Sequence, residues 1–280
     1  MYRISKHDAT IATLAYGDVF DYSLTRQELI RWFLYYPVRA VVIPKDTGFS
    51  MINQKAPWQA GKWAIARRAS RWLSAIPTIQ LVGVTGGLAM NNAGRDDDID
   101  LFFIVADGTL WISRMMVTLL VDLLGLRRHP NEVSVANKVC LNMFMTASST
   151  GLPDRDRDCF TAHEVLQMAP LWEQKGTYKK FLRSNRWVAR YLPNAWKEKQ
   201  TIKVMEMCTS FPLVIFLMRL FEWPAKQLQL WYMARHRTRE VITDTILRFH
   251  PKDARVWIKR KLSARLAKFH IPLDKVFYAS

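Results

Sequence analysis

Residues 81–105 read LVGVTGGLAMNNAGRDDDIDLFFIV. An apolar strand opens this stretch and runs into two adjacent glycines, Gly86 and Gly87, here called the glycine pair. Glycine accepts backbone conformations that other residues avoid, and it lets backbone N–H groups approach an anion closely. The pattern therefore predicts a strand that ends in a turn suited to binding a phosphate group.

A second apolar strand begins with two carboxylates, Asp98 and Asp100, here called the aspartate pair. Because alternate side chains of a strand share a face, both aspartates are expected to point one way while Ile99 points into the core. Neighbouring carboxylates repel each other and lose hydration, and a divalent cation between them relieves the repulsion. Mg²⁺ is usually bound by one or two carboxylates together with substrate phosphates. The aspartate pair is thus the predicted ligand set for Mg²⁺ or Mn²⁺; the alternative is a surface turn with a solvated acidic loop.

Residues 84–102 resemble the signature of the polymerase-beta-like nucleotidyltransferase superfamily, in which Gly and Gly or Ser are followed, after a spacer, by Asp, an apolar residue and Asp. The resemblance implies an α/β (α+β) fold with a mixed sheet. It implies that the aspartate pair binds the metal and that the glycine pair, with a helix starting at Leu88, holds the triphosphate of a nucleotide. Arg95, in the spacer, is a candidate phosphate contact; the alternative is a loop cation that pairs with Asp96 or Asp97.

The same resemblance implies a reaction. A nucleotide moves from a nucleoside triphosphate to an acceptor hydroxyl on RNA, on a protein or on a small molecule, and pyrophosphate leaves. Two Mg²⁺ ions commonly clamp the attacking and leaving oxygens in this kind of displacement. The resemblance leaves the acceptor open.

The family's third carboxylate usually lies on a later strand, and the expected strand here, Lys138 to Met145, carries Asn142 at the matching position. Asparagine can coordinate a metal through its amide oxygen but cannot accept a proton. Three alternatives follow: two carboxylates suffice with Asn142 as a third metal ligand, another acid replaces the missing one, or the domain binds nucleotide or nucleic acid without catalysis. The acids considered as replacements are Glu132, Asp154, Asp156, Asp158 and Glu164.

Two further stretches, LAYGDVFDYSLT at 14–25 and CFTAHEVLQMAPLW at 159–172, resemble a group of uncharacterised bacterial nucleotidyltransferase-domain proteins. This resemblance spans most of the chain and supports its domain order, but it implies no particular substrate. Within the second stretch, Thr161 is the expected N-cap of a helix. His163 beside Glu164 is either a general base or part of a polar cluster at the helix start.

The chain divides into three predicted segments: a winged-helix-like module at 1–56, the catalytic core at 57–158 and a mostly helical region at 159–280. The module consists of a helix from Ile4 to Tyr16, a second helix and a hairpin within residues 41–52. Winged helices bind nucleic acid or serve as docking modules, and the few cations on the second helix favour docking.

The second helix of the module has a recognisable start. Thr25 is followed three residues later by Glu28, which predicts a capping box. In the core segment, helices are expected at Gln59–Ala75, around Leu88–Asn92 and at Thr109–Leu124.

The composition is strongly basic: 280 residues include 41 Lys and Arg against 24 Asp and Glu, for a net charge of +17. Such a charge favours polyanionic partners, namely nucleotides, nucleic acid or an anionic membrane surface. Cations are densest in the last segment, where they alternate with tryptophans, and this arrangement favours RNA. The alternative is solvated helix faces with core tryptophans. The tryptophans concerned are Trp187, Trp196, Trp231 and Trp257.

Three cysteines, Cys140, Cys159 and Cys208, fit no zinc-binding spacing and indicate free thiols in a reducing compartment. The first residues lack the apolar core of a secretory signal, so we expect a cytoplasmic protein. The most apolar tract, Met207 to Met233, holds an uninterrupted apolar run too short to span a bilayer. A buried core helix is expected there; the alternative is an amphipathic helix lying on a membrane.

Overall fold

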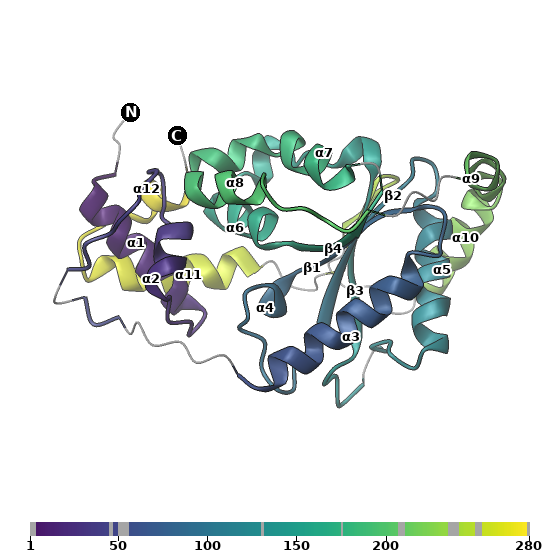
Figure 1. Cartoon of the computed structure of the whole chain (residues 1–280), viewed down its shortest axis with the longest axis horizontal. Coiled ribbons are helices and arrows are strands. Elements are labelled where there is room, and N and C mark those ends of the chain that lie inside the picture. Colours follow the sequence, from purple (N-terminus) through teal and green to yellow (C-terminus); the bar gives the residue numbers. More distant parts are fainter. Residues whose placement is uncertain are drawn as a thin grey trace.

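A six-stranded mixed sheet lies at the centre of the part of the chain that the computed structural model describes, residues 4–44, 47–49, 56–129, 132–174, 176–206, 211–234, 241–249 and 254–278 (Figure 1). The strand order is β4-β1-β2-β3-β6-β5. Only the β2–β3 pair is parallel among these described strands, and the other neighbours are antiparallel. The strands are β1 (Ile79–Val84), β2 (Ile99–Val105), β3 (Val139–Thr146), β4 (Ala169–Glu173), β5 (Val241–Ile242) and β6 (Ile246–Arg248).

The centre of the sheet forms where local sequence predicts it. The expected strands of the 81–105 stretch are confirmed as β1 and β2, which pair antiparallel with Val84 opposite Leu101. The predicted strand at 138–145 is confirmed as β3. The helices between them are α3 (Trp58–Leu73), α4 (Gly86–Ala89) and α5 (Leu110–Leu123). The order from α3 to β3 is therefore helix, strand, helix, strand, helix, strand.

Each face of the sheet is covered by its own helices. Phe103 and Val105 point to the face that α3, α5 and α10 (Glu222–Ala234) cover. Phe102 and Ile104 point to the other face. Because side chains alternate along a strand, the aspartate pair belongs to the face of Phe102. That face packs against α6 (Cys159–Gln167), α7 (Thr177–Ser184) and α8 (Pro193–Lys199).

Segments from both halves of the chain form the helical unit at the left of Figure 1. It contains α1 (Lys6–Val19), α2 (Arg26–Arg31), α11 (Ala254–Ala267) and α12 (Leu273–Phe277). Phe20, after α1, packs edge-on against Trp257 of α11, and Arg265 Nη2 donates to the Asp18 carbonyl at 2.8 Å. The segment 159–280 therefore contributes helices to this unit as well as strands β4, β5 and β6 to the sheet.

Some local predictions hold and others differ. The capping box of Thr25 and Glu28 is confirmed at the start of α2. Thr161 is not the N-cap of α6; Asp158 is, and its carboxylate accepts from the Thr161 backbone N–H at 2.8 Å. Asp158 is the N-cap because the helix begins three residues earlier than expected.

The predicted hairpin within residues 41–52 is not seen in its described part, since 41–44 and 47–49 contain no strand. The rest of that hairpin lies outside the described residues. The expectation of a mostly helical last segment also missed β4, β5 and β6, because strand pairing depends on partners far away in the sequence.

The prediction of a buried helix within Met207–Met233 is wrong for the first helix of that tract and holds in part for α10, where Ala225, Gln229 and Met233 are buried. Helix α9 (Pro212–Arg219) has no buried residue. Apolar residues occupy all its sides, so no single packing contact could cover them. Six large apolar side chains on α9, on α10 and between the two helices are 58–70% exposed, and we call them the apolar surface. Its members are Leu213, Phe216, Leu220, Phe221, Trp223 and Trp231.

Polar contacts hold α10 to the core beneath this surface. The Glu222 carboxylate accepts from the backbone N–H groups of Trp111 and Ile112 at the start of α5, at 2.9 and 3.0 Å. Gln229 donates to the Trp111 carbonyl at 2.8 Å. Among the described residues, none of the helices has the length and hydrophobicity needed to cross a bilayer.

Candidate functional site

The aspartate pair lies together with Cys140 at the edge of the sheet. Single ligand atoms of Asp98, Asp100 and Cys140 lie within 4.8 Å of one another. Cys140 joins them because β3 runs parallel to β2 and Cys140 is the register partner of Asp100. The structure thus brings the two predicted aspartates together and adds a thiol for which the sequence had indicated no role in the site.

Charge at this cluster is partly balanced by Arg128, which the sequence reasoning missed. Its guanidinium donates to Asp98 Oδ2 at 2.6 Å. Loss of hydration, and secondarily repulsion from Asp98, raises the pKa of Asp100 to about 7. Burial also raises the pKa of the Cys140 thiol, so this group stays protonated and neutral. The sequence signal for Arg128 was a cation in the loop between α5 and β3, whose end lies beside the start of β2.

The glycine pair lies against the aspartate pair. Gly86 has φ +65°, and a Cβ added there would lie 2.5 Å from Asp100 Oδ2, closer than any side chain tolerates. Gly87 is exposed and Leu88 is buried, so Leu88 reaches solvent only weakly. The helix expected around Leu88–Asn92 is the single turn α4, which begins at Gly86 instead. Such a short helix adds little dipole, so close approach of the backbone is what the turn offers.

The donor set of this cluster suits a hard cation. Two carboxylates at one point, without a thiolate or a histidine, are the oxygen ligands that Mg²⁺ uses when substrate phosphates complete its shell. The pKa of Asp100 is raised because its negative charge is poorly hydrated and lies near that of Asp98. A bound cation would offset this charge. Asp98 and Asp100 are therefore the residues that would hold Mg²⁺ or Mn²⁺.

Helix α3 fixes the spacer between the glycine and aspartate pairs through side chains that donate to the spacer. Lys62, fully buried, donates from Nζ to the Asp97 carbonyl at 2.5 Å, next to Asp98. Gln59 Nε2 donates to the Ala93 carbonyl at 2.8 Å. The donors are Trp58, Gln59, Lys62 and Trp63. In the sequence, Lys62 is one cation of an amphipathic helix, and its burial is visible only in the structure.

Arg95 and Asn142 are the remaining predicted site residues, and their surroundings differ. Arg95 is exposed, and within the described residues it forms no ion pair with Asp96 or Asp97. Asn142 is only 5% exposed, and its amide Nδ2 donates to Thr85 Oγ1 at 3.1 Å. Nothing in the structure tests whether Asn142 binds the metal, and this assignment stays a prediction.

Of the five acids considered as a third carboxylate, Glu164 is the one whose charge acts on Asp100. Its charge contributes to the raised pKa of Asp100, and loss of hydration raises its own pKa to about 7. The other four form ion pairs: Asp154 with Arg157, Asp156 and Asp158 with Arg255, and Glu132 with Lys138.

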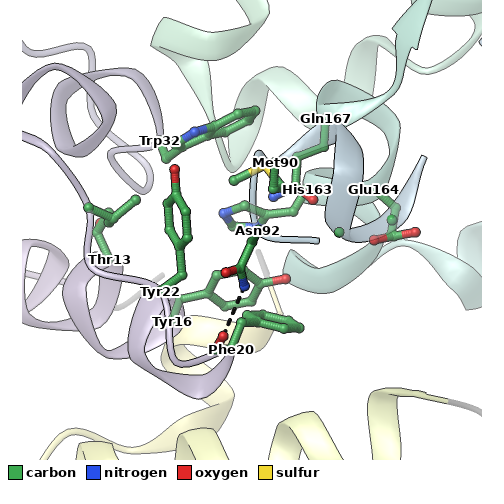
Figure 2. A pocket seen from close by; sticks show the side chains of 14 residues that line it. Thr13, Tyr16, Phe20, Tyr22, Trp32, Met90, Asn92, His163, Glu164 and Gln167 are labelled. Atoms are coloured by element: carbon green, nitrogen blue, oxygen red, sulfur yellow. Dashed lines mark hydrogen bonds between the residues drawn. The ribbon is translucent and has the colours of Figure 1, made fainter. Parts of the chain in front are cut away.

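The three sequence stretches that carry the resemblances meet at a small pocket of about 130 Å³ (Figure 2). Tyr16 stacks on His163 with ring centroids 3.9 Å apart. His163 donates from Nδ1 to the Cys159 carbonyl at 2.8 Å, and burial lowers its pKa to about 4. A neutral, stacked and hydrogen-bonded histidine has the features of a structural residue. Glu164 lies across the pocket from Tyr22 in Figure 2.

A larger cavity of about 400 Å³ lies on the other side of Glu164. It includes Thr85, Phe102 and Asn142, so it begins one strand pleat beyond Asp100. Glu164 lines both this cavity and the small pocket. The volume of the larger cavity falls within the range of small-molecule sites, roughly 300–1,000 Å³.

Comparison of the chain with protein-family models and with curated protein sequences finds no match.

Proposed function

We propose that this protein is a Mg²⁺-dependent nucleotidyltransferase with a polymerase-beta-like core. It moves a nucleotide from a nucleoside triphosphate to an acceptor hydroxyl and releases pyrophosphate. The observation that carries the proposal is how close Asp100 lies to Gly86: its Oδ2 would be 2.5 Å from a Cβ added at Gly86. The glycine pair and the aspartate pair, the two parts of the sequence signature, therefore meet at one point. The helix and strand order from α3 to β3 supports the same core.

Each group has a role in this reaction. Mg²⁺ held by the aspartate pair would offset the charge of the phosphate oxygens. Backbone N–H groups at Gly86 and Gly87 would approach the phosphates, and Arg128, already within reach of Asp98, would add positive charge. Lys62 acts as a positioning residue, because it holds the backbone at Asp97 from inside the core.

The test uses purified protein with Mg²⁺ or Mn²⁺ and each of the four α-³²P-labelled nucleoside triphosphates. Total cell extract serves as the acceptor pool, and products are separated into RNA, protein and small-molecule fractions. We expect label in one fraction, and its loss in the double variant Asp98→Ala, Asp100→Ala. A folded protein that binds nucleotide but labels no fraction would instead be a binding protein with a nucleotidyltransferase fold, the alternative that Asn142 suggested.

A second candidate function, association with an anionic membrane, is favoured by the apolar surface on α9 and α10. Soluble domains rarely expose apolar patches of this kind without a partner. Tryptophans suit the membrane interface, and the net charge of +17 attracts anionic headgroups. The same charge opposes pairing of two copies through this surface. This role is compatible with catalysis at the aspartate pair, which lies on the opposite face of the sheet from α10.

Sedimentation with phosphatidylglycerol vesicles tests this role. We expect binding that persists in high salt, because salt screens electrostatic contacts and leaves apolar burial intact. The double variant Phe216→Asp, Leu220→Asp should bind about a hundredfold more weakly, since it removes two large apolar side chains that the bilayer would bury. Val133→Asp, at an exposed site far from α9 in the sequence, is the matched control and should bind normally. Release of the wild-type protein by salt would refute insertion of the apolar surface.

A further inference from the structure

The cavity beyond Asp100 differs from an ordinary core void in its polar groups. Asn142, Glu164 and Arg248 line it among mostly apolar neighbours such as Met145 and Phe181. A cavity with an apolar body and a few convergent polar groups is the usual form of a small-molecule site. Its volume of about 400 Å³ suits a small molecule.

Asn142 offers an unsatisfied acceptor at the end of the cavity nearest the aspartate pair. Its Nδ2 binds Thr85, but its buried Oδ1 has no hydrogen-bond partner. A buried carbonyl oxygen without a hydrogen-bond donor lowers the stability of the fold by about 1–3 kcal/mol, so native proteins rarely contain one. A hydroxyl on a bound ligand would supply the missing donor.

Arg248 offers an unpaired cation on the cavity wall. It lies on β6 opposite Met143 of β3, and it is half-buried. Within the described residues its guanidinium forms no ion pair within 4 Å and no hydrogen bond, although Glu164 lies near enough to feel its charge. Arg255, by contrast, is paired with Asp156 at 3.1 Å. A carboxylate or phosphate on the ligand would match Arg248.

We propose that this cavity binds the acceptor, and that the acceptor is a small acid with an apolar body and a nucleophilic hydroxyl. The proposal rests on the nucleotidyl transfer proposed above. The acid group pairs with Arg248, the apolar body fills the cavity, and the hydroxyl lies at Asn142, one pleat from Asp100. RNA, which the sequence had favoured as the acceptor, is the competing outcome of the test below; of the basic helices, α11 contributes Ala254 and Arg255 to the wall of this cavity.

We assign Glu164 as the base that takes the proton of the acceptor hydroxyl. It lines the cavity, and its charge is felt at Asp100. The acceptor hydroxyl gives its proton to the Glu164 carboxylate while its oxygen bonds to the α-phosphorus. The bond from the α-phosphorus to the bridging oxygen breaks, and pyrophosphate leaves with that electron pair. Loss of hydration raises the pKa of Glu164 to about 7, opposed by Arg248, which suits a base that works near neutral pH.

The experiment offers the whole protein three separate acceptor pools: total RNA, total protein and a small-molecule extract. Labelled nucleoside triphosphate and Mn²⁺ are held constant. We expect label in the small-molecule pool. Arg248→Met should raise the amount of that pool needed for half-maximal rate by about ten- to a hundredfold. Glu164→Gln should lower the maximal rate by about a hundredfold without that shift. Asn142→Leu, with no change of charge, should also weaken the use of the acceptor.

Arg260→Met, on the exposed side of α11, is the matched control and should change neither quantity. Equilibrium dialysis of nucleotide in the presence of Mn²⁺ separates the two proposals. Label in RNA or protein, or small-molecule labelling that Arg248→Met and Asn142→Leu both leave unchanged, overturns the acceptor cavity while nucleotidyl transfer stands. Absence of nucleotide binding, or binding without any labelled product, overturns nucleotidyl transfer and the cavity's role with it.

Discussion

Asp100→Asn is expected to reduce nucleotidyl transfer by about a thousandfold or more, because loss of a metal ligand removes several kcal/mol of transition-state stabilisation. The side chain keeps its size, so the contact with Gly86 remains sterically possible. Initial rates with labelled nucleotide, measured against the wild-type protein, give the size of the effect. Asp96→Asn, at an exposed aspartate of the same spacer, is the control and should keep full activity.

The same substitution should stabilise the metal-free protein. The pKa of Asp100 is about 7 in the folded chain and near 4 when unfolded, so ionisation costs about 4 kcal/mol of folding free energy. Because the folded pKa is the higher one, this cost is absent below pH 4, grows as the pH rises, and is complete above pH 7. Asp100→Asn should therefore gain about 2–4 kcal/mol at pH 8 and almost nothing at pH 4.

Urea unfolding in EDTA at both pH values measures this gain. An inactive variant that is more stable at pH 8 would mark Asp100 as a residue kept for function at the expense of stability. If the variant is equally stable at both pH values, the buried charge at Asp100 is not the cost that we infer. Full activity in the variant would remove Asp100 from the metal site altogether.

Gly86→Ala is the second large effect that we expect, with a loss of activity of about a hundredfold. The new methyl group would stand 2.5 Å from Asp100 Oδ2, so the carboxylate has to move. Displacement of a reacting group by about 1 Å can cost a hundredfold in rate. The positive φ of +65° adds a backbone cost of about 1–2 kcal/mol for alanine.

Gly125→Ala separates the backbone cost from the loss of geometry. Gly125 has φ +66°, and an added Cβ would meet nothing within 4 Å. Its alanine variant should lose the same stability, as measured by thermal unfolding, yet keep its activity. Equal loss of activity in both variants would mean that stability, and not the position of Asp100, controls the rate.

Local signals made much of the core predictable. The capping box of Thr25 and Glu28 depends on residues three apart, and β1 and β2 depend on short apolar runs, so these elements were found. The aspartate pair shares a face because of strand periodicity alone. Strand β6 was not predictable in the same way, because it forms only through pairing with β3, far earlier in the chain.

The rest of the site required knowledge of which segments meet. Cys140 joins the aspartates only because β3 is parallel to β2 with Cys140 in register with Asp100. Lys62 and Arg128 act from a helix and a loop that the motif does not include. In the sequence, Glu164 was one of five acids considered equally as the third carboxylate. The structure distinguishes it, because it lines both cavities.

The pairing of α1 with α11 has a consequence for biosynthesis. The hydrogen-bonded partners Asp18 and Arg265 are 247 positions apart. At ribosomal speeds, α1 emerges roughly ten to fifty seconds before α11 exists. Phe20, which lines the small pocket, meanwhile lacks the Trp257 ring that it packs against. A nascent chain can thus present its glycine and aspartate pairs well before this wall is finished, so the pocket matures late in translation.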